Sequence, residues 1–439
     1  MGTTSRQRRD IRERKRQHSW RHRQPELGPE QLTIEDLVLA GAAWAFGGAA
    51  DEFLLDRHVD LLAAREQGVD TAGAVSTIVA RVLSGLWERG WQPMDLAHVV
   101  RREWPQRIGR LALAVIAQDA HATGAASRAP REWAAQLCVL GATTSAPGPA
   151  VHAWWRKEGL TTVDGWRDAL RLLGQLLQLP PLQVLVPPPA EWGRSRQEGA
   201  AVGAVEPKAL AKIRALLAKA ESTDYPEEAE ALTAKAQDLM TRYAIDAAVL
   251  HAKRGSSVAE EVRGRRVHID RPYPDAKVQL LDSVARANTA RVVWFEPLGM
   301  ASVVGLPTDL DLVELLFTSL LVQATRGMAE AGRGGGDRGG RTRSRGFRRA
   351  FLLSYAMRIG ERLQRSSVQA NKEASRTYGS ALVPLLRERS EAVEEVFAEL
   401  FPDTVVRQSR PVDRQGWYAG RAAADRADLG ARRDELTGK

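Results

Sequence analysis

Hydrophobic residues recur at helical spacing along the first part of the chain. In residues 70–90 they fall at every third or fourth position, at Val75, Ile78, Val79, Val82, Leu83 and Leu86. This spacing places the side chains on one face of a helix. Similar segments open at Thr33-Ile34-Glu35-Asp36 and return at 95–104, 108–120 and 163–179. The pattern predicts an all-α domain over residues 31–179, with most of the tryptophans of that stretch buried in its core.

The pattern changes in the C-terminal part of the chain, where short apolar runs alternate with long helical segments. The runs at 265–269, 291–295 and 301–305 have the length and composition of strands. Helical spacing covers 275–288, 309–331, 347–374, 388–401 and 416–429. We therefore expect a small α+β domain over residues 262–439, with more helix than sheet, in a protein that is mainly α.

Three stretches lack either pattern. Residues 1–30 are polar and basic and contain almost no large aliphatic side chains, which is typical of a disordered arm. Residues 180–206 begin with two groups of prolines and continue with glycine, alanine and arginine, which predicts a linker. Residues 332–346 are almost entirely glycine and arginine and predict a flexible loop between two helices of the C-terminal domain.

Residues 207–254 combine helical spacing with turn chemistry. The first apolar stripe ends before Ser222, and the segment from there to Pro226 breaks the pattern. Asp224 is placed to cap a second helix, and Pro226 costs no hydrogen bond in the first turn of that helix. Small residues in the second stripe, Ala229 and Ala236, would let two helices approach closely. The segment therefore predicts a compact helical hairpin.

This hairpin resembles a family of bacterial and phage proteins catalogued as domain of unknown function 2786. The resemblance rests on residues 212–220, 226–229 and 235–240. Its main positions are Lys212, Leu216, Leu217, Pro226, Glu228, Ala229, Ala236, Leu239 and Met240. The segment that follows also resembles a companion C-terminal domain of such proteins. The resemblance implies a family without an assigned activity, so it brings no catalytic residue to this chain.

The positive charge of the chain is concentrated in two short segments. Residues 1–23 hold nine Lys and Arg against two acids, or +7, and residues 333–349 hold seven Arg against one Asp, or +6. The formal net charge of the whole chain is +9, so the remaining residues sum to −4. The parts that we expect to fold are therefore close to neutral.

Arginines in such segments can contact nucleic acid. A guanidinium makes bidentate contacts to phosphate and stacks on bases, with little readout of sequence. We expect DNA or RNA contacts from Arg333, Arg338, Arg341, Arg343, Arg345, Arg348 and Arg349, and from Arg8, Arg9 and Arg12 in the N-terminal arm. A solvated loop insertion explains the first set equally well, and a disordered tail that aids solubility is the favoured explanation of the N-terminal arm. The neighbouring Phe347 and Tyr355 are expected in a helix core rather than as stacking platforms.

The sequence contains no strong signal for catalysis, a metal or a cofactor. The motifs HExxH, GxxxxGK[ST] and GxSxG are absent, and the single cysteine, Cys138, rules out a multi-cysteine zinc site. A metal-dependent hydrolase or nuclease could use Asp270, Asp282 and Glu296 if they converged. The neighbouring Asp275 is better explained as a helix cap. We expect no cofactor and no catalytic residue, and keep the carboxylate site as an alternative.

Two further observations bear on packing and location. Gly416 and Gly420 lie four residues apart in a helical segment, which favours close helix packing or a tight docking turn. Arg421 beside them is expected as a surface arginine, with a ligand role as the alternative. The N-terminus has no secretory signal, and the longest apolar run is too short to cross a bilayer, which predicts a cytoplasmic protein without a membrane partner. Our leading hypothesis is a non-enzymatic protein associated with nucleic acid, and a protein-interaction scaffold is the second.

Overall fold

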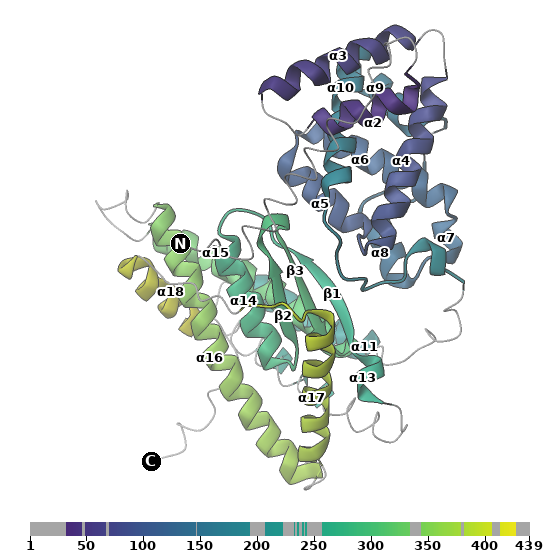
Figure 1. Ribbon diagram of the computed structural model, residues 1–439. Helices are drawn as coiled ribbons and strands as arrows, with labels where there is room; N and C mark the ends of the chain where they lie inside the picture. Colours follow the sequence, from purple (N-terminus) through teal and green to yellow (C-terminus); the bar gives the residue numbers. More distant parts are fainter. Residues whose placement is uncertain are drawn as a thin grey trace, which may run out of the picture. The chain divides into compact units, whose positions relative to one another are not determined.

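The computed structural model describes most of the chain, and Figure 1 shows its elements. The described residues are 32–45, 49–66, 70–145, 147–193, 207–222, 257–333, 344–378, 382–405 and 413–426, with seven single positions between 232 and 243. They form two compact units, residues 1–192 and residues 193–439. Helices dominate both units, and the one sheet of the described part is small, so the prediction of a mainly α protein is confirmed.

The first unit is a bundle of helices around α10 (Thr162–Gln178), which contacts α2, α3, α4, α6 and α9. Trp166, Leu170 and Leu173 of α10 are buried among these neighbours. The other helices are α2 (Ile34–Trp44), α3 (Ala49–Arg65), α4 (Thr71–Glu88), α5 (Pro93–Glu103), α6 (Gln106–Ala122), α7 (Ala125–Arg128), α8 (Arg131–Val139) and α9 (Ala150–Glu158). Seven tryptophans of this unit are buried, as the sequence predicts: Trp87, Trp91, Trp133, Trp154, Trp155, Trp166 and Trp192.

The chain after α10 folds back onto this unit instead of leaving it as a linker. The indole of Trp91 donates to the carbonyl of Pro180 (2.8 Å). Trp192, which follows the 3₁₀ turn η1 (Pro189–Glu191), lies edge-on against Trp133, with ring centroids 5.5 Å apart. The prediction of a linker from residue 180 is therefore wrong for residues 180–193. Pattern reading missed this because the anchoring contacts come from indole rings and backbone carbonyls, not from a periodic apolar stripe.

The second unit contains an antiparallel sheet of three strands, β1 (Arg263–His268), β3 (Met300–Gly305) and β2 (Arg291–Phe295), in that order. The central strand β3 is buried at every position. One face of the sheet packs on α14 (Pro274–Ala287) and α15 (Pro307–Arg333), and the other on α13 (Val258–Glu261) and α17 (Leu382–Leu400). The strand pair predicted around residue 298 is present, with the turn η2 (Glu296–Leu298) between its strands.

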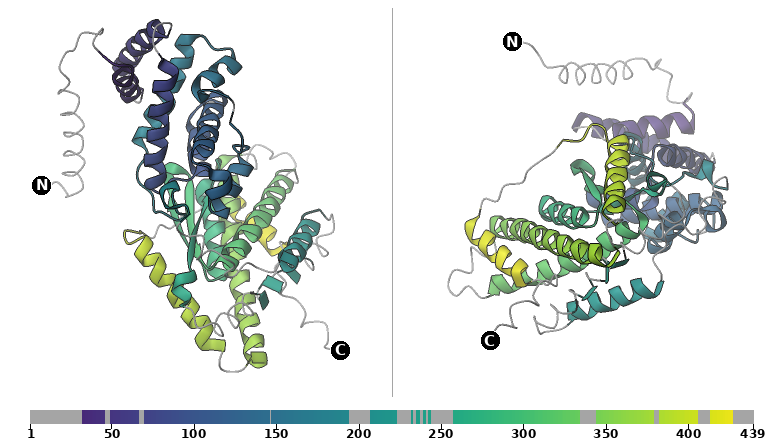
Figure 2. Two further views of the ribbon diagram at one scale, coloured as in Figure 1. Left: turned by 90° about the vertical axis from the view of Figure 1, so that its right-hand side faces the viewer. Right: turned by 90° about the horizontal axis from the view of Figure 1, so that it is seen from below.

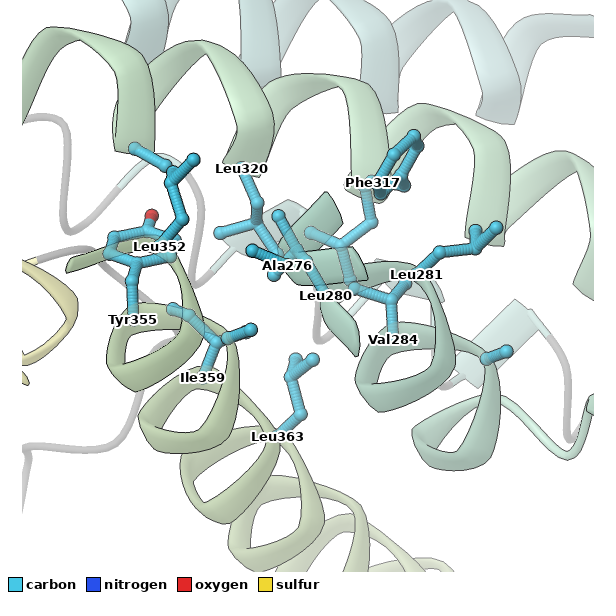
Figure 3. Packing of buried hydrophobic residues seen from close by; sticks show 14 of the residues in the cluster. Ala276, Leu280, Leu281, Val284, Phe317, Leu320, Leu352, Tyr355, Ile359 and Leu363 are labelled. Atoms are coloured by element: carbon cyan, nitrogen blue, oxygen red, sulfur yellow. The ribbon is translucent and has the colours of Figure 1, made fainter. Parts of the chain in front are cut away.

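The main core of the second unit lies between α14, α15 and the long helix α16 (Arg345–Tyr378). Figure 3 shows Leu280 and Val284 of α14, Leu320 of α15, and Ile359 and Leu363 of α16 meeting there. Phe347 and Tyr355 are also buried in this core, as expected. A last helix, α18 (Arg414–Arg426), lies along α16 (Figure 2).

Helix α15 is long and apolar enough, by length and composition, to cross a membrane over Pro307–Ala331. A core helix of a folded domain passes the same test. In this structure Leu316, Leu320 and Ala324 of α15 are buried in the core with α14 and α16. Within the described residues, core packing accounts for these apolar side chains of α15.

Candidate nucleic-acid interface

Helices α16 and α18 are in very close contact and run in the same direction. A Cβ added at Gly416 would overlap the carbonyl of Phe347, and one added at Gly420 would overlap the carbonyl of Phe351 and the hydroxyl of Ser354. The contacting residue pairs advance in the same direction along both helices, from Gly416 with Phe347 to Gly420 with Phe351, so the helices are parallel. The prediction that these two glycines serve close helix contact is confirmed.

Helix α14 also runs parallel to α16. Near the start of both helices, Arg349 Nε donates to Asp275 Oδ2 (2.8 Å). Further along, a Cβ at Gly360 would approach Ser283 Oγ to 3.0 Å. Helices α14, α16 and α18 therefore all begin at one end of the second unit, which we call the N-terminal end of the three helices. The backbone N–H groups of a first turn give such an end a partial positive charge.

The start of α14 differs from the prediction that Asp275 caps this helix. The N-cap of α14 is Tyr273, and it makes no side-chain capping bond. Asp275 lies inside the first turn and pairs with Arg349 across the interface with α16 (Nη2–Oδ2 2.5 Å). The interpretation of Asp275 as a helix cap is therefore wrong. An acid near a helix start has the same sequence pattern whether it caps that helix or pairs with a neighbouring one. Only the position of α16 shows that Asp275 pairs with Arg349.

Three exposed arginines lie at the N-terminal end of the three helices. Arg345 and Arg348 are exposed in the first turn of α16, and Arg414 is exposed at the first position of α18. Ser344 caps α16, since its Oγ accepts from the N–H of Phe347 (3.0 Å). Arginine side chains and helix starts both favour a negatively charged ligand.

The predicted arginines therefore have different surroundings. Arg333 is the last residue of α15, while Arg345 and Arg348 are helical and exposed rather than part of a loop. Arg349 is helical too, and its ion pair with Asp275 makes it a structural contact. The remaining predicted arginines, Arg338, Arg341, Arg343, Arg8, Arg9 and Arg12, lie outside the described residues.

An ion-pair network further along α16 holds α18 in place. Glu361 accepts two hydrogen bonds from Arg421 of α18 (3.1 and 3.2 Å) and one from Arg358 (2.7 Å). The hydrogen bond from Arg358 lowers the pKa of Glu361 most, burial opposes this shift, and the hydrogen bonds and charge of Arg421 lower the pKa further. Arg358 also bonds Asp425 at the end of α18. Arg421, expected as an ordinary surface arginine, is therefore a docking residue of α18.

Sequence reasoning missed one aromatic side chain of this region. Tyr418 lies between the two glycines of α18 and is 66% exposed. The prediction of helix contact rests on the two glycines and makes no statement about the side chain between them. The signal was present in the helical period: a residue two positions from each glycine lies on the opposite face of the helix.

The alternative carboxylate site does not assemble. Asp282 is on α14 and pairs with Arg286 of the same helix (2.8 Å), whereas Glu296 directly follows β2 and begins η2. Asp270 follows β1, and its backbone carbonyl accepts from Lys277 Nζ (2.8 Å). Among the described residues, which include these three acids, no group of three or more His, Cys, Asp or Glu side chains could hold a metal ion.

The predicted hairpin packs on α15. Its first helix, α11 (Pro207–Ser222), buries Ile213 and Leu217 against Ala236, Met240 and Leu312. Leu216 and Leu239 are partly buried at the edge of this cluster, and Lys212 is exposed. A groove of about 320 Å³ between α11 and α15 is lined by charged and apolar side chains. Pro226, Glu228 and Ala229 lie outside the described residues.

Comparisons with known proteins identify only this hairpin. No curated protein and no solved structure matches the chain. Residues 208–247 match one family model, and no companion domain is matched after them. The matched segment is the one whose buried positions, Ile213, Leu217, Ala236 and Met240, attach it to α15. Residues 208–247 therefore carry the signature of the family described as Protein of unknown function (DUF2786).

Proposed function

We propose that this protein binds nucleic acid, without catalysis, through the N-terminal end of the three helices. The observation that carries the proposal is the gathering of Arg345, Arg348 and Arg414 at an end where three parallel helices begin. The arginine-rich residues 334–343 lie in the sequence between α15 and the start of α16. Phosphate contacts from arginine give affinity that falls steeply as salt concentration rises.

The folded part supplies geometry that a charged tail lacks. The docking of α16 on α14 through Arg349 and Asp275, and of α18 on α16 through the two glycines, places the exposed arginines on a rigid surface. Rigid placement lowers the entropy lost when the arginines contact a phosphate backbone. In this proposal the family segment 208–247 is a structural module that packs on α15.

The test compares two triple variants that lose the same charge from exposed positions of this unit. The first replaces the exposed arginines at the proposed interface, as Arg345→Gln, Arg348→Gln and Arg414→Gln. The second, Lys372→Gln, Arg376→Gln and Arg387→Gln, changes exposed side chains at the other end of α16 and on α17. Binding of a labelled duplex is titrated over a range of salt concentrations for each protein.

The first triple variant should bind more weakly, and each lost phosphate contact should reduce the slope of log affinity against log salt by about 0.9 for duplex DNA. The second triple variant should behave as the wild-type protein. Equal losses in both variants would show a general effect of net charge and refute the interface. A wild-type protein that binds no nucleic acid would refute the proposal as a whole.

A further inference from the structure

Tyr418 lies at a position that helix contacts do not explain. Its neighbours Gly416 and Gly420 face α16, and two residues along a helix correspond to a turn of about 200°, so Tyr418 faces away from α16. Tyr418 is 66% exposed, whereas the other large exposed hydrophobic residues described in this unit are not aromatic. An aromatic ring is therefore presented to solvent on the outer face of α18.

Positive charge lies on the same face. Arg414 is four residues before Tyr418 and exposed, and residues four apart are neighbours on a helix surface. Ala422, four residues after Tyr418, is exposed and small, and leaves space beside the ring. Arg414, Tyr418 and Ala422 thus form a stripe along α18 that carries one guanidinium and one aromatic face.

We infer that this stripe binds single-stranded nucleic acid, with a base stacked on Tyr418 and the backbone held by Arg414. The inference rests on the proposed function and names its substrate class. In a duplex the faces of the bases are covered by their neighbours, so an aromatic ring cannot stack on them without opening the helix. In a single strand each base has an accessible face, and aromatic side chains beside arginines are the usual binding groups.

The exposed arginines at the start of α16 favour a nucleic acid over an apolar ligand at this stripe. The N-terminal end of α18 meets the start of α16, where Arg345 and Arg348 are exposed. An apolar partner would leave these guanidinium groups without a counter-charge, whereas a phosphate backbone supplies one for each. A ligand that carries both bases and phosphates therefore suits this end of α18 better than an apolar one.

The experiment measures binding of the full-length protein to labelled oligothymidylate and to a duplex of the same length. The variants are Tyr418→Ala, Tyr418→Phe and the control Val383→Ala, which changes another exposed apolar side chain on α17. Thermal melting of each protein checks the fold, which an exposed position should leave unchanged.

Tyr418→Ala should weaken binding of the single strand roughly 5- to 100-fold and leave duplex binding as in the wild-type protein. Tyr418→Phe should keep the affinity, because it keeps the ring, and Val383→Ala should have no effect. Unchanged single-strand binding by Tyr418→Ala would overturn the inference, and so would an equal loss with both ligands. If the arginine triple variant still lowers duplex affinity in either case, the proposed function stands without the stacking contact.

Discussion

Asp309 at the start of α15 and Arg389 of α17 form an ion pair inside the second unit, with Nη2 and Oδ2 2.8 Å apart. The two side chains are only 2% and 7% exposed. Burial raises the pKa of Asp309, although the charge and hydrogen bond of Arg389 oppose the shift. The pair connects helices that cover opposite faces of the sheet.

The first prediction concerns the loss of one partner of this pair. Arg389→Met should destabilise the protein by about 3 to 5 kcal/mol, because it leaves the carboxylate of Asp309 buried without its counter-charge. The double variant Asp309→Leu, Arg389→Met should recover most of that loss, since it buries no charge. Urea denaturation measures both values. A double variant no more stable than the single one would show that the changed packing volume, and not the unpaired carboxylate, causes the loss of stability.

The second prediction concerns Asp119, which accepts a hydrogen bond from the Trp87 indole in the first unit (2.9 Å). Burial raises the pKa of Asp119 to about 6, against 3.8 for an ordinary Asp, and the indole hydrogen bond lowers it by less. A raised pKa means that the folded state binds the proton more tightly. The stability contribution of this group is therefore present below the unfolded pKa and is lost as pH rises through about 6.

Asp119→Asn should remove this pH dependence, because the amide oxygen still accepts from Trp87 without ionising. The variant should be more stable than the wild-type protein at neutral pH, by at most about 3 kcal/mol, and equal to it at acidic pH. Melting temperatures across the acid-to-neutral range provide the measurement. A difference that stays constant with pH would contradict the assignment of the effect to ionisation.

The third prediction concerns the contact between α16 and α18. Gly420→Ala should weaken the docking of α18 by about 1 to 3 kcal/mol, because the added methyl group overlaps backbone atoms of Phe351 that cannot rotate away. Gly346→Ala is the matched control, since the nearest atom to its added Cβ would be 3.9 Å away. The control should be neutral or slightly stabilising. Hydrogen exchange of α18 amides distinguishes local undocking from global unfolding.

The fourth prediction concerns Tyr355 of the second unit (Figure 3), whose buried hydroxyl has no hydrogen-bond partner among the residues that the structure describes. Burial also raises the pKa of this hydroxyl. Tyr355→Phe should be neutral or stabilising by roughly 1 kcal/mol, because it removes an unsatisfied polar atom and keeps the ring against Phe351. Denaturant titration measures the change. A loss above about 1 kcal/mol would indicate that the hydroxyl has a bound partner in solution.

Local signals in the sequence are sufficient to predict where several helices begin. Thr33 caps α2 and accepts from the N–H of Asp36, whose carboxylate bonds back to Thr33, and Asp70 caps α4. These contacts join residues three apart, so a single sequence contains all the information that they need. The helical period and the glycine spacing of α18 belong to the same class of signal.

The sequence by itself determined the mainly helical fold, the strands around residue 298 and the family segment 208–247, because each depends on neighbours within a few turns of chain. Tertiary structure alone decided that α14, α16 and α18 are parallel, that Asp275 pairs with Arg349, and that Arg345 and Arg348 of α16 lie at the same end as Arg414 of α18. These relations join residues about 70 positions apart, as Asp275 and Arg349 are. No periodicity encodes them, because helices with similar apolar stripes could pack against several partners. Only the formation of the core determines which helices pack together.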